Sequence, residues 1–216
     1  SLLNESSKIE NLMDKVKELG MDSVAITDHG VMFGVVDFYK KAKKKGINPI
    51  IGCEVYVSFR SRHDRENIDK KSYHLILLAE NNEGYQNLIK IVSAGFVEGF
   101  YYKPRVDYEI LKKYSKGIIA LSACLAGEIP QRLMEGKYPE AKLAAERLSE
   151  LFGKNNFYLE LQDHDIPEQA RVNMYIQKLS RETGIPMVAT NDVHYLTKED
   201  WKTHEILMCI QTGKTL

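Results

Sequence analysis

Six short apolar runs, separated by stretches with helical periodicity, constrain the fold of this chain more than any other feature. We predict that these runs are strands: Ser23–Thr27, Asn48–Val57, Tyr73–Ala79, Gly117–Leu121, Phe157–Leu161 and Pro186–Thr190. Strands that are apolar along their whole length are typical of a parallel or mostly parallel sheet, because helices cover both of its faces. The alternation of strands and helices therefore predicts an α/β fold. The 216 residues contain no repeat and no linker, which predicts one domain.

The helices are predicted from apolar residues that recur every three or four positions. The first follows the capping box Ser7–Glu10, the second ends in a lysine-rich turn before Gly46, and the others cover Asn82–Phe96, Tyr138–Phe152, Pro167–Thr183 and Thr197–Cys209. The polar segment between Asn48–Val57 and Tyr73–Ala79 has no helical period. We therefore expect these two strands to form an antiparallel return, which would bring His74 alongside Glu54.

Side chains of the kinds that bind metals stand on or beside most of the predicted strands. They are Asp28, His29, Glu54, His74, Cys124, Asp192 and His194. Nitrogen, oxygen and sulfur donors together suit Zn, Mn or Fe better than Ca or Mg. The donors are tens of residues apart, so only the fold can gather them, as is common in catalytic metal sites. Because they come from nearly every strand, they favour a closed barrel over an open sheet with a single switch point.

Composition excludes some functional classes. Lys and Arg together number 30, as do Asp and Glu, so net charge provides no bulk attraction to DNA or to a membrane. Three cysteines at unrelated spacings form no disulfide framework, which favours the reducing cytoplasm. No apolar run approaches the roughly 18 residues of a membrane span.

Four segments resemble the successive motifs of the PHP (polymerase and histidinol phosphatase) superfamily. They are Ile26–Gly30, Gly52–Tyr56, His74–Ala79 and Thr190–Tyr195. Two further segments, Gly99–Asp107 and Ile210–Leu216, are typical of the branch found in the alpha subunits of bacterial replicative DNA polymerases. The resemblance covers essentially the whole chain.

The resemblance implies a distorted (β/α)7 TIM-like barrel with up to three divalent transition-metal ions at its mouth. The residues on family ligand positions are His29, Glu54, His74, Cys124, Asp192 and His194. Of these, Glu54 is expected to bridge two metals, and Glu54, Asp192 and His194 are the expected catalytic residues. Asp28 precedes a ligand and is expected to orient its neighbours. His164 stands after a strand, where it is expected either to orient the ligands or to contact substrate.

Two departures from the family pattern stand at the start of the chain. Asn4 occupies a position where the family usually has a metal-binding Asp, and an amide is the weaker donor. The family's first strand, which carries a His-x-His pair, is expected before residue 1, so we expect this barrel to lack its first strand. The body of the polymerase would follow residue 216.

The function implied by the resemblance is metal-dependent phosphodiester hydrolysis, with 3′–5′ exonuclease proofreading as the expected role in DNA replication. The enzyme as a whole would be a DNA-directed DNA polymerase, a nucleotidyltransferase. Its expected partners are DNA, the polymerase body and a separate proofreading subunit. The expected contacts with nucleic acid or with a neighbouring domain are Tyr101, Tyr102, Lys103 and Arg105.

Two alternatives stand beside this interpretation. The chain could be a non-catalytic module that braces the polymerase or docks the proofreading subunit. It could also be a free-standing phosphoesterase similar to histidinol phosphatase, although the segment Gly99–Asp107 argues against this.

Overall fold

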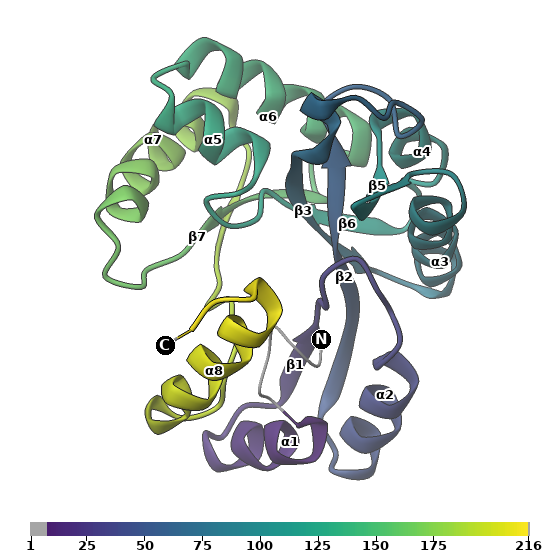
Figure 1. The fold of residues 1–216 in the computed structure, drawn as a ribbon, viewed down its shortest axis with the longest axis vertical. Helices are drawn as coiled ribbons and strands as arrows, with labels where there is room; N and C mark the ends of the chain where they lie inside the picture. The colour runs from purple at the N-terminus through teal and green to yellow at the C-terminus, as the bar shows by residue number, and fades with distance from the viewer. Residues whose placement is uncertain (1–7, 216) are drawn as a thin grey trace. The chain divides into compact units, whose positions relative to one another are not determined.

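The computed structural model describes residues 8–215, which form an α/β fold (Figure 1). Ser7 of the predicted capping box and Asn4 lie outside the described residues. The chain forms two compact units. The first contains Phe33–Ile51, the described residues before Thr27 and those from Asp192 onward, and the second contains Thr27–Met32 and Gly52–Asn191. Assignment of the chain to one PHP-type domain stays a prediction.

The helices of the described chain lie close to their predicted positions. They are α1 (Ile9–Glu18), α2 (Val35–Lys44), α3 (Asn82–Val97), α4 (Tyr108–Lys113), α5 (Glu128–Met134), α6 (Tyr138–Phe152), α7 (Pro167–Thr183) and α8 (Trp201–Thr212), with short 3-10 turns η1 (Asn67–Lys70) and η2 (Lys198–Asp200). The helix α4 was not predicted. It begins where the Asp107 side chain accepts a hydrogen bond from the backbone N–H of Ile110, a normal N-cap.

All six predicted strands are confirmed, and the described residues add two more. The strands are β1 (Ser23–Ile26), β2 (Asn48–Ser58), β3 (Ser72–Ala79), β4 (Phe100–Tyr101), β5 (Lys103–Val106), β6 (Ile118–Leu121), β7 (Phe157–Leu161) and β8 (Met187–Ala189). The two additions, β4 and β5, form an antiparallel hairpin in a segment where the sequence predicted no strand. Tyr102, at its tip, has a positive φ of 61°.

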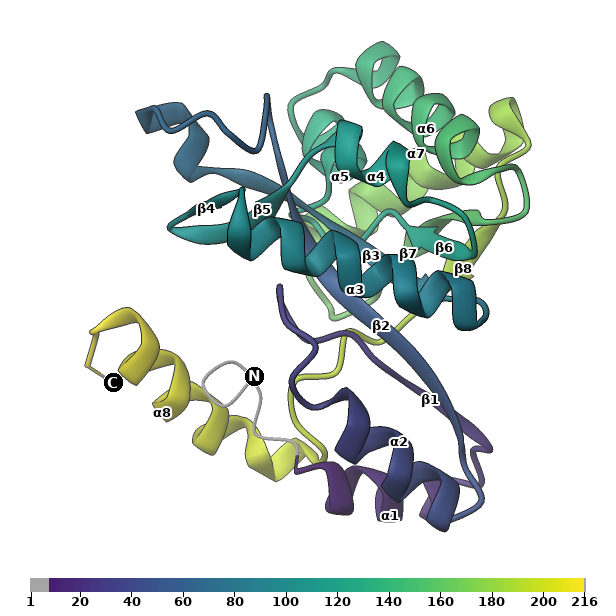
Figure 2. The ribbon, with the colours of Figure 1, turned by 90° about the vertical axis from the view of Figure 1, so that its right-hand side faces the viewer.

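In the first unit, α1 and α2 pack beside a short parallel pair formed by β1 and the first residues of β2 (Figure 2). The core contains Met13 and Val16 from α1 and Phe38 and Ala42 from α2. These apolar residues recur at helical spacing, which explains why both helices bury one face against the same core.

The second unit is built on a sheet with the strand order β4-β5-β2-β3-β6-β7-β8. Its larger core lies between one face of the sheet and the helices α3 to α7, and includes Val55, Leu77 and Phe157 (Figures 1 and 2). The opposite face carries a smaller apolar cluster around Ile76 and Leu121. Successive side chains of a strand point to opposite faces, so Glu54 and His74 lie on the second face, level with Ile76 and Tyr56.

Strand β3 runs antiparallel to both of its neighbours, β2 and β6, whereas β5 lies parallel to β2 and β6 to β7. The predicted antiparallel return from β2 is therefore confirmed. Its physical cause is the connection from Phe59 to Lys71, which contains one short 3-10 turn and no crossover helix.

Candidate metal centre

The turn after β1 is fixed against the backbone of Glu54. The backbone N–H of Glu54 donates to the carbonyl of Asp28 over 3.1 Å, and the N–H of Gly30 donates to the carbonyl of Glu54 over 2.8 Å. These bonds hold His29 opposite Glu54 as an isolated parallel bridge. The expected role of the Asp28 side chain in orienting its neighbours stays a prediction.

Glycine is required at position 30 for two reasons. Its φ is +69°, a left-handed conformation that residues with a Cβ rarely adopt. A Cβ there would also lie 2.9 Å from Cγ of Pro104 and 3.0 Å from Cε2 of Tyr56. The turn carrying His29 is therefore packed tightly against both β2 and β5.

Three of the expected ligands come together in the second unit. His29, Glu54 and His74 each offer one donor atom, and these atoms all lie within 4.8 Å of one another. His29 Nε2 lies 3.4 Å from Glu54 Oε2, and His74 Nδ1 hydrogen-bonds to Glu54 Oε1. His74 reaches this position because β3 pairs antiparallel with β2, in a register that sets His74 opposite Tyr56.

The chemistry of this donor set fits a transition metal. The Glu54 residue is 3% exposed, and a buried carboxylate is costly unless cations or hydrogen bonds compensate its charge. Its two oxygens face different imidazoles, an arrangement that suits a carboxylate shared between two metal ions. Two imidazole nitrogens and a carboxylate are ligands common to Zn, Mn and Fe sites.

Sequence reasoning gave no role to Tyr56, although its ring forms one wall of this cluster. The ring centroid lies 5.1 Å from that of His74 and 6.3 Å from that of His29. Burial, together with the charge of Glu54, raises the pKa of Tyr56 to about 12, so the phenol stays neutral. The available signal was the strand period, because position 56 shares a face with position 54.

The two cysteines of the second unit differ in their surroundings. Cys53 is fully buried and its thiol donates to the carbonyl of Asp28, as expected for a core residue. Burial raises the pKa of Cys53 to about 12. Cys124 is half-buried in the loop after β6 and lies outside the group formed by His29, Glu54 and His74. The preceding Ala123 has a φ of 64°, so the backbone is strained beside this expected ligand.

His164 uses both ring nitrogens within the second unit. Its Nε2 lies 2.7 Å from the carbonyl oxygen of Asn191 and donates to it, whereas Nδ1 accepts from Gln169 Nε2 over 2.9 Å. Since the carbonyl belongs to the residue before Asp192, His164 is placed to orient the backbone that leads to an expected ligand. Its role in the site stays a prediction.

Asp192 and His194 belong to the first unit, where they lie next to each other. His194 Nδ1 lies 2.8 Å from the carbonyl oxygen of Asp192 and 3.8 Å from Oδ1 of its carboxylate. Asp192 has a φ of 46°, an uncommon conformation for a residue other than glycine. The ring of His204 lies 5.6 Å from that of His194.

Arg105, which we expected to contact nucleic acid or a neighbouring domain, is buried within this chain, and such a contact stays a prediction. This residue is 0% exposed. Its guanidinium donates hydrogen bonds to backbone carbonyls, those of Arg62, Asp64, Asp69 and Gly99. Charge alone suggested an exposed contact, but the planar fork of donors suits the inside of a turn that presents several carbonyls.

The other residues expected to make contacts remain at least partly accessible. Tyr101 is half-buried with its ring 5.3 Å from the Arg105 guanidinium, and Tyr102 is 66% exposed at the hairpin tip. Lys103 is exposed, with Nζ 4.3 Å from the ring centroid of Tyr56. A contact of Tyr101, Tyr102 or Lys103 with nucleic acid or another domain stays a prediction.

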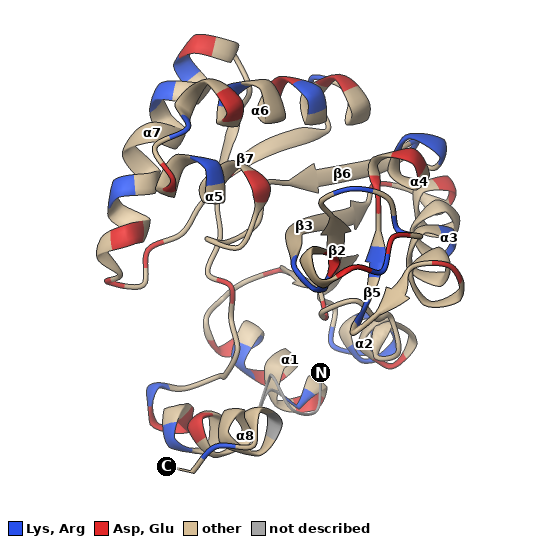
Figure 3. Ribbon diagram, turned by 45° about the horizontal axis from the view of Figure 1, so that its top comes forward, with Lys and Arg blue, Asp and Glu red and all other residues tan. Residues whose placement is uncertain are grey.

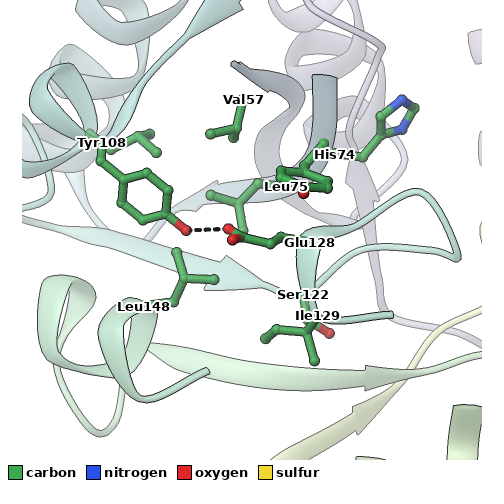
Figure 4. Close-up of a pocket in the computed structure, with 10 residues that line it drawn as sticks. Val57, His74, Leu75, Tyr108, Ser122, Glu128, Ile129 and Leu148 are labelled. Atoms are coloured by element: carbon green, nitrogen blue, oxygen red, sulfur yellow. Dashed lines mark hydrogen bonds between the residues drawn. The ribbon is translucent and has the colours of Figure 1, made fainter. Parts of the chain in front are cut away.

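A pocket beside β3 has His74 among its lining residues, together with Tyr108 and Glu128. Figure 4 shows the Tyr108 hydroxyl bonded to the Glu128 carboxylate in this pocket, while the His74 imidazole points away from them. Arg147 donates to both groups. Burial and the Glu128 charge hold the pKa of Tyr108 above its usual value. The pocket walls are otherwise mainly apolar, and the polar groups of Tyr108 and Glu128 bind each other.

Comparison with known proteins decides the family. The model of the PHP domain matches residues 1–164. This chain belongs to the PHP domain family. An amidohydrolase from Chromobacterium violaceum shares its fold, with a TM-score of 0.54 and 11% identity over 94% of this chain and 93% of that one. A two-domain protein from Bacteroides vulgatus, with a predicted PHP-like metal-dependent phosphoesterase, gives a TM-score of 0.52 and 12% identity over 98% of this chain and 52% of that one.

The curated relatives of this PHP domain are much longer than the chain. DNA polymerase III subunit alpha of Borreliella burgdorferi is 46% identical over 215 residues, which are 99% of this chain and 19% of that protein. The subunit of the same name from Thermus aquaticus is 46% identical over 100% of this chain and 18% of its own length. The chain therefore spans about a fifth of these relatives. Each helix within residues 8–215 is too short or too polar to cross a membrane.

Proposed function

We propose that this PHP domain is a metal-dependent phosphoesterase within the alpha subunit of a bacterial replicative DNA polymerase, where it hydrolyses phosphodiesters at a DNA 3′ end. The observation that carries the proposal is the buried carboxylate of Glu54, which faces the imidazoles of His29 and His74 with one oxygen each. The names of the polymerase relatives favour this setting over a free-standing phosphatase.

The residues of the chain have distinct roles in this proposal. His29 and His74 donate ring nitrogens, and Glu54 holds the two sides of the site together as a bridging carboxylate. Asp192 and His194, together with Cys124, are the further proposed ligands. A bound divalent ion would lower the pKa of a water molecule toward roughly 7 and stabilise negative charge on the phosphate. Zn, Mn and Fe are the candidate ions.

The proposed reaction is the addition of water across the terminal P–O3′ bond of a DNA strand. The water oxygen bonds to phosphorus, the P–O3′ bond breaks, and the products are a nucleoside 5′-monophosphate and a shortened strand that ends in a 3′ hydroxyl. Such a step would serve proofreading during replication in the cytoplasm. The proposed partners are DNA, the polymerase body and a proofreading subunit.

The test compares Glu54→Gln with His63→Gln in the full-length protein. Glutamine keeps the shape of Glu54 but removes the charge that two ions would share, so we expect bound metal to fall by at least one ion per chain. Hydrolysis of a 3′-terminal nucleotide should fall about a hundredfold or more, as is common when a ligand of a catalytic metal is lost. His63 is an exposed loop residue, and its variant should behave as the unmutated protein does.

Two results would contradict this proposal. One is equal metal content in the Glu54 and His63 variants, measured by elemental analysis. The other is a metal-loaded unmutated protein that leaves 3′ ends intact with Mn or Zn added. The second result would favour the alternative of a non-catalytic module that docks a proofreading subunit.

A further inference from the structure

We propose that Lys103 binds a phosphate oxygen of the substrate at the candidate metal centre. The inference rests on the proposed function and adds to it the residue that recognises the charge of the substrate. It is drawn from where the backbone places Lys103, from its contact with Tyr56 and from the charges around it.

The backbone sets Lys103 level with Glu54. Strand β5 lies parallel to β2, with Arg105 opposite Tyr56, so Lys103 and Glu54 each stand two residues before that pair. Side chains two residues apart in a strand share a face, so Lys103 lies on the face that carries Glu54 and Tyr56. The next residue, Pro104, packs against the Gly30 turn and ties the hairpin to the segment that carries His29.

The side chain of Lys103 lies against the aromatic wall of the cluster. Its Nζ is 4.3 Å from the ring centroid of Tyr56, a cation–π contact. The same ring contacts His29 and His74, so the ammonium is separated from both imidazoles by a single side chain. A substrate phosphate bound between the imidazoles would come within reach of a flexible four-carbon side chain.

The charge of Lys103 is available for a ligand. Among residues 8–215, Lys103 has no ion pair with a carboxylate, unlike Lys41, Lys45 and Lys142 elsewhere on the surface. Partial desolvation lowers the pKa of Lys103, and the charge of Glu54 opposes this shift. Lysine is a common phosphate ligand because its ammonium is a compact point charge with three donors.

Arg105, in the same strand, differs from Lys103 in how its charge is used. It shares a face with Lys103, but backbone carbonyls around the connection after β2 take up its donors. Lys103 lies beside Glu54, two residues before Arg105 along the strand, and its side chain is exposed. The strand thus carries one buried cation that holds a loop and one exposed cation beside the candidate centre.

The test uses three variants of the full-length protein. Lys103→Met keeps the length of the side chain and removes its charge, and Lys103→Arg restores a charge. Lys70→Met is the matched control, because the Lys70 ammonium also contacts a tyrosine ring, 4.9 Å from the ring centroid of Tyr102. Lys70 precedes the start of β3, where that strand pairs with Ser58 and not with Glu54. Three quantities are measured: metal content, the affinity of the Mn-loaded protein for thymidine 5′-monophosphate and for inorganic phosphate, and KM and kcat for 3′-end hydrolysis.

We expect Lys103→Met to bind thymidine monophosphate and phosphate about ten- to a hundredfold more weakly, the usual loss when a charged hydrogen bond is removed. Its KM should rise in proportion while its metal content stays unchanged. Lys103→Arg should recover most of the affinity, and Lys70→Met should match the unmutated protein.

The outcomes separate this inference from the proposed function. Nucleotide binding that depends on Lys103, in a protein that hydrolyses no 3′ end, would support the lysine contact and contradict the catalytic proposal. Hydrolysis with the same KM in Lys103→Met and in the unmutated protein would support the catalytic proposal and contradict the lysine contact. Loss of metal in Lys103→Met, or an unmutated protein that binds neither anion, would overturn the inference about Lys103.

Discussion

Arg105 buries a full positive charge, and no carboxylate among residues 8–215 forms an ion pair with its guanidinium. Four backbone carbonyls accept its hydrogen bonds instead, and three of them come from the connection between β2 and β3. Burial lowers the pKa of Arg105, and nearby Asp69 opposes the shift. An arginine remains charged in either case, so those carbonyls keep a permanent donor.

Replacing Arg105 by Met should therefore destabilise the fold. The carbonyls would lose their donors inside the protein, where water cannot replace them, and the free energy of unfolding should fall by roughly 3–5 kcal/mol. Urea denaturation measures this loss. Arg65→Met is the control, because Arg65 lies exposed in the same connection and its replacement should change stability by less than about 0.5 kcal/mol. Equal effects of the two changes would contradict the structural role of Arg105.

Among the elements, the turn from Asp28 to Gly30 is the piece on which the cluster depends most. Its hydrogen bonds flank Glu54 on both sides, and Gly30 fits under Pro104 and Tyr56 only because it lacks a Cβ. A change in this turn should therefore affect stability and metal binding together.

Gly30→Ala separates crowding from backbone strain when it is compared with Gly136→Ala. Both glycines have similar positive φ values, +69° and +74°, but Gly136 has no atom within 4 Å of an added Cβ. We expect Gly136→Ala to lower the free energy of unfolding by about 1 kcal/mol, from backbone strain alone. Gly30→Ala should lower the free energy of unfolding by about 1–3 kcal/mol more, because the added Cβ overpacks the turn, and it should reduce the amount of metal bound. Thermal melts measure the loss of stability, and elemental analysis measures the bound metal. Equal losses of stability in the two variants would show that the turn can move to make room for the added Cβ.

The elements also show what could be predicted from the sequence. The six apolar strands were predictable because burial on a sheet imposes a continuous apolar run. Strand β5 could not be predicted, because Lys103, Pro104 and Arg105 have a local pattern typical of a loop. They form a strand only because they pair with β2. In the cluster, the approach of His74 to Glu54 followed from the missing crossover helix. The burial of Arg105 depends on tertiary contacts that no local pattern contains.

The molecule as a whole carries balanced charge, with Lys and Arg interspersed with Asp and Glu along its helices (Figure 3). Its response to acid therefore depends on particular carboxylates more than on net charge. Asp107 is buried, which alone would raise its pKa. Hydrogen bonds from the backbone N–H groups of Arg62 and Ile110, together with the Arg62 guanidinium, reverse this effect and lower the pKa.

A lowered pKa in the folded state means that Asp107 contributes stability above the ordinary carboxyl pKa of about 4, and that this contribution disappears as pH falls through the lower folded value. We expect the free energy of unfolding to fall below about pH 4. Asp107→Asn should be less stable at neutral pH and should lose less stability on acidification. Urea denaturation from pH 7 to pH 3 measures both slopes, and parallel slopes would show that Asp107 has no part in acid sensitivity.

The reversed direction of β3 has a consequence for the order of assembly during synthesis. Because β3 returns directly alongside β2, the expected ligands His29, Glu54 and His74 all come from one continuous stretch of chain, residues 29 to 74. Short loops close at low entropic cost, and contacts between nearby residues form quickly. The ribosome makes this stretch before β6, β7 and β8, so β2 and β3 can pair before the rest of the sheet has been synthesised. An ion that binds these side chains early would favour the native register over a slipped one.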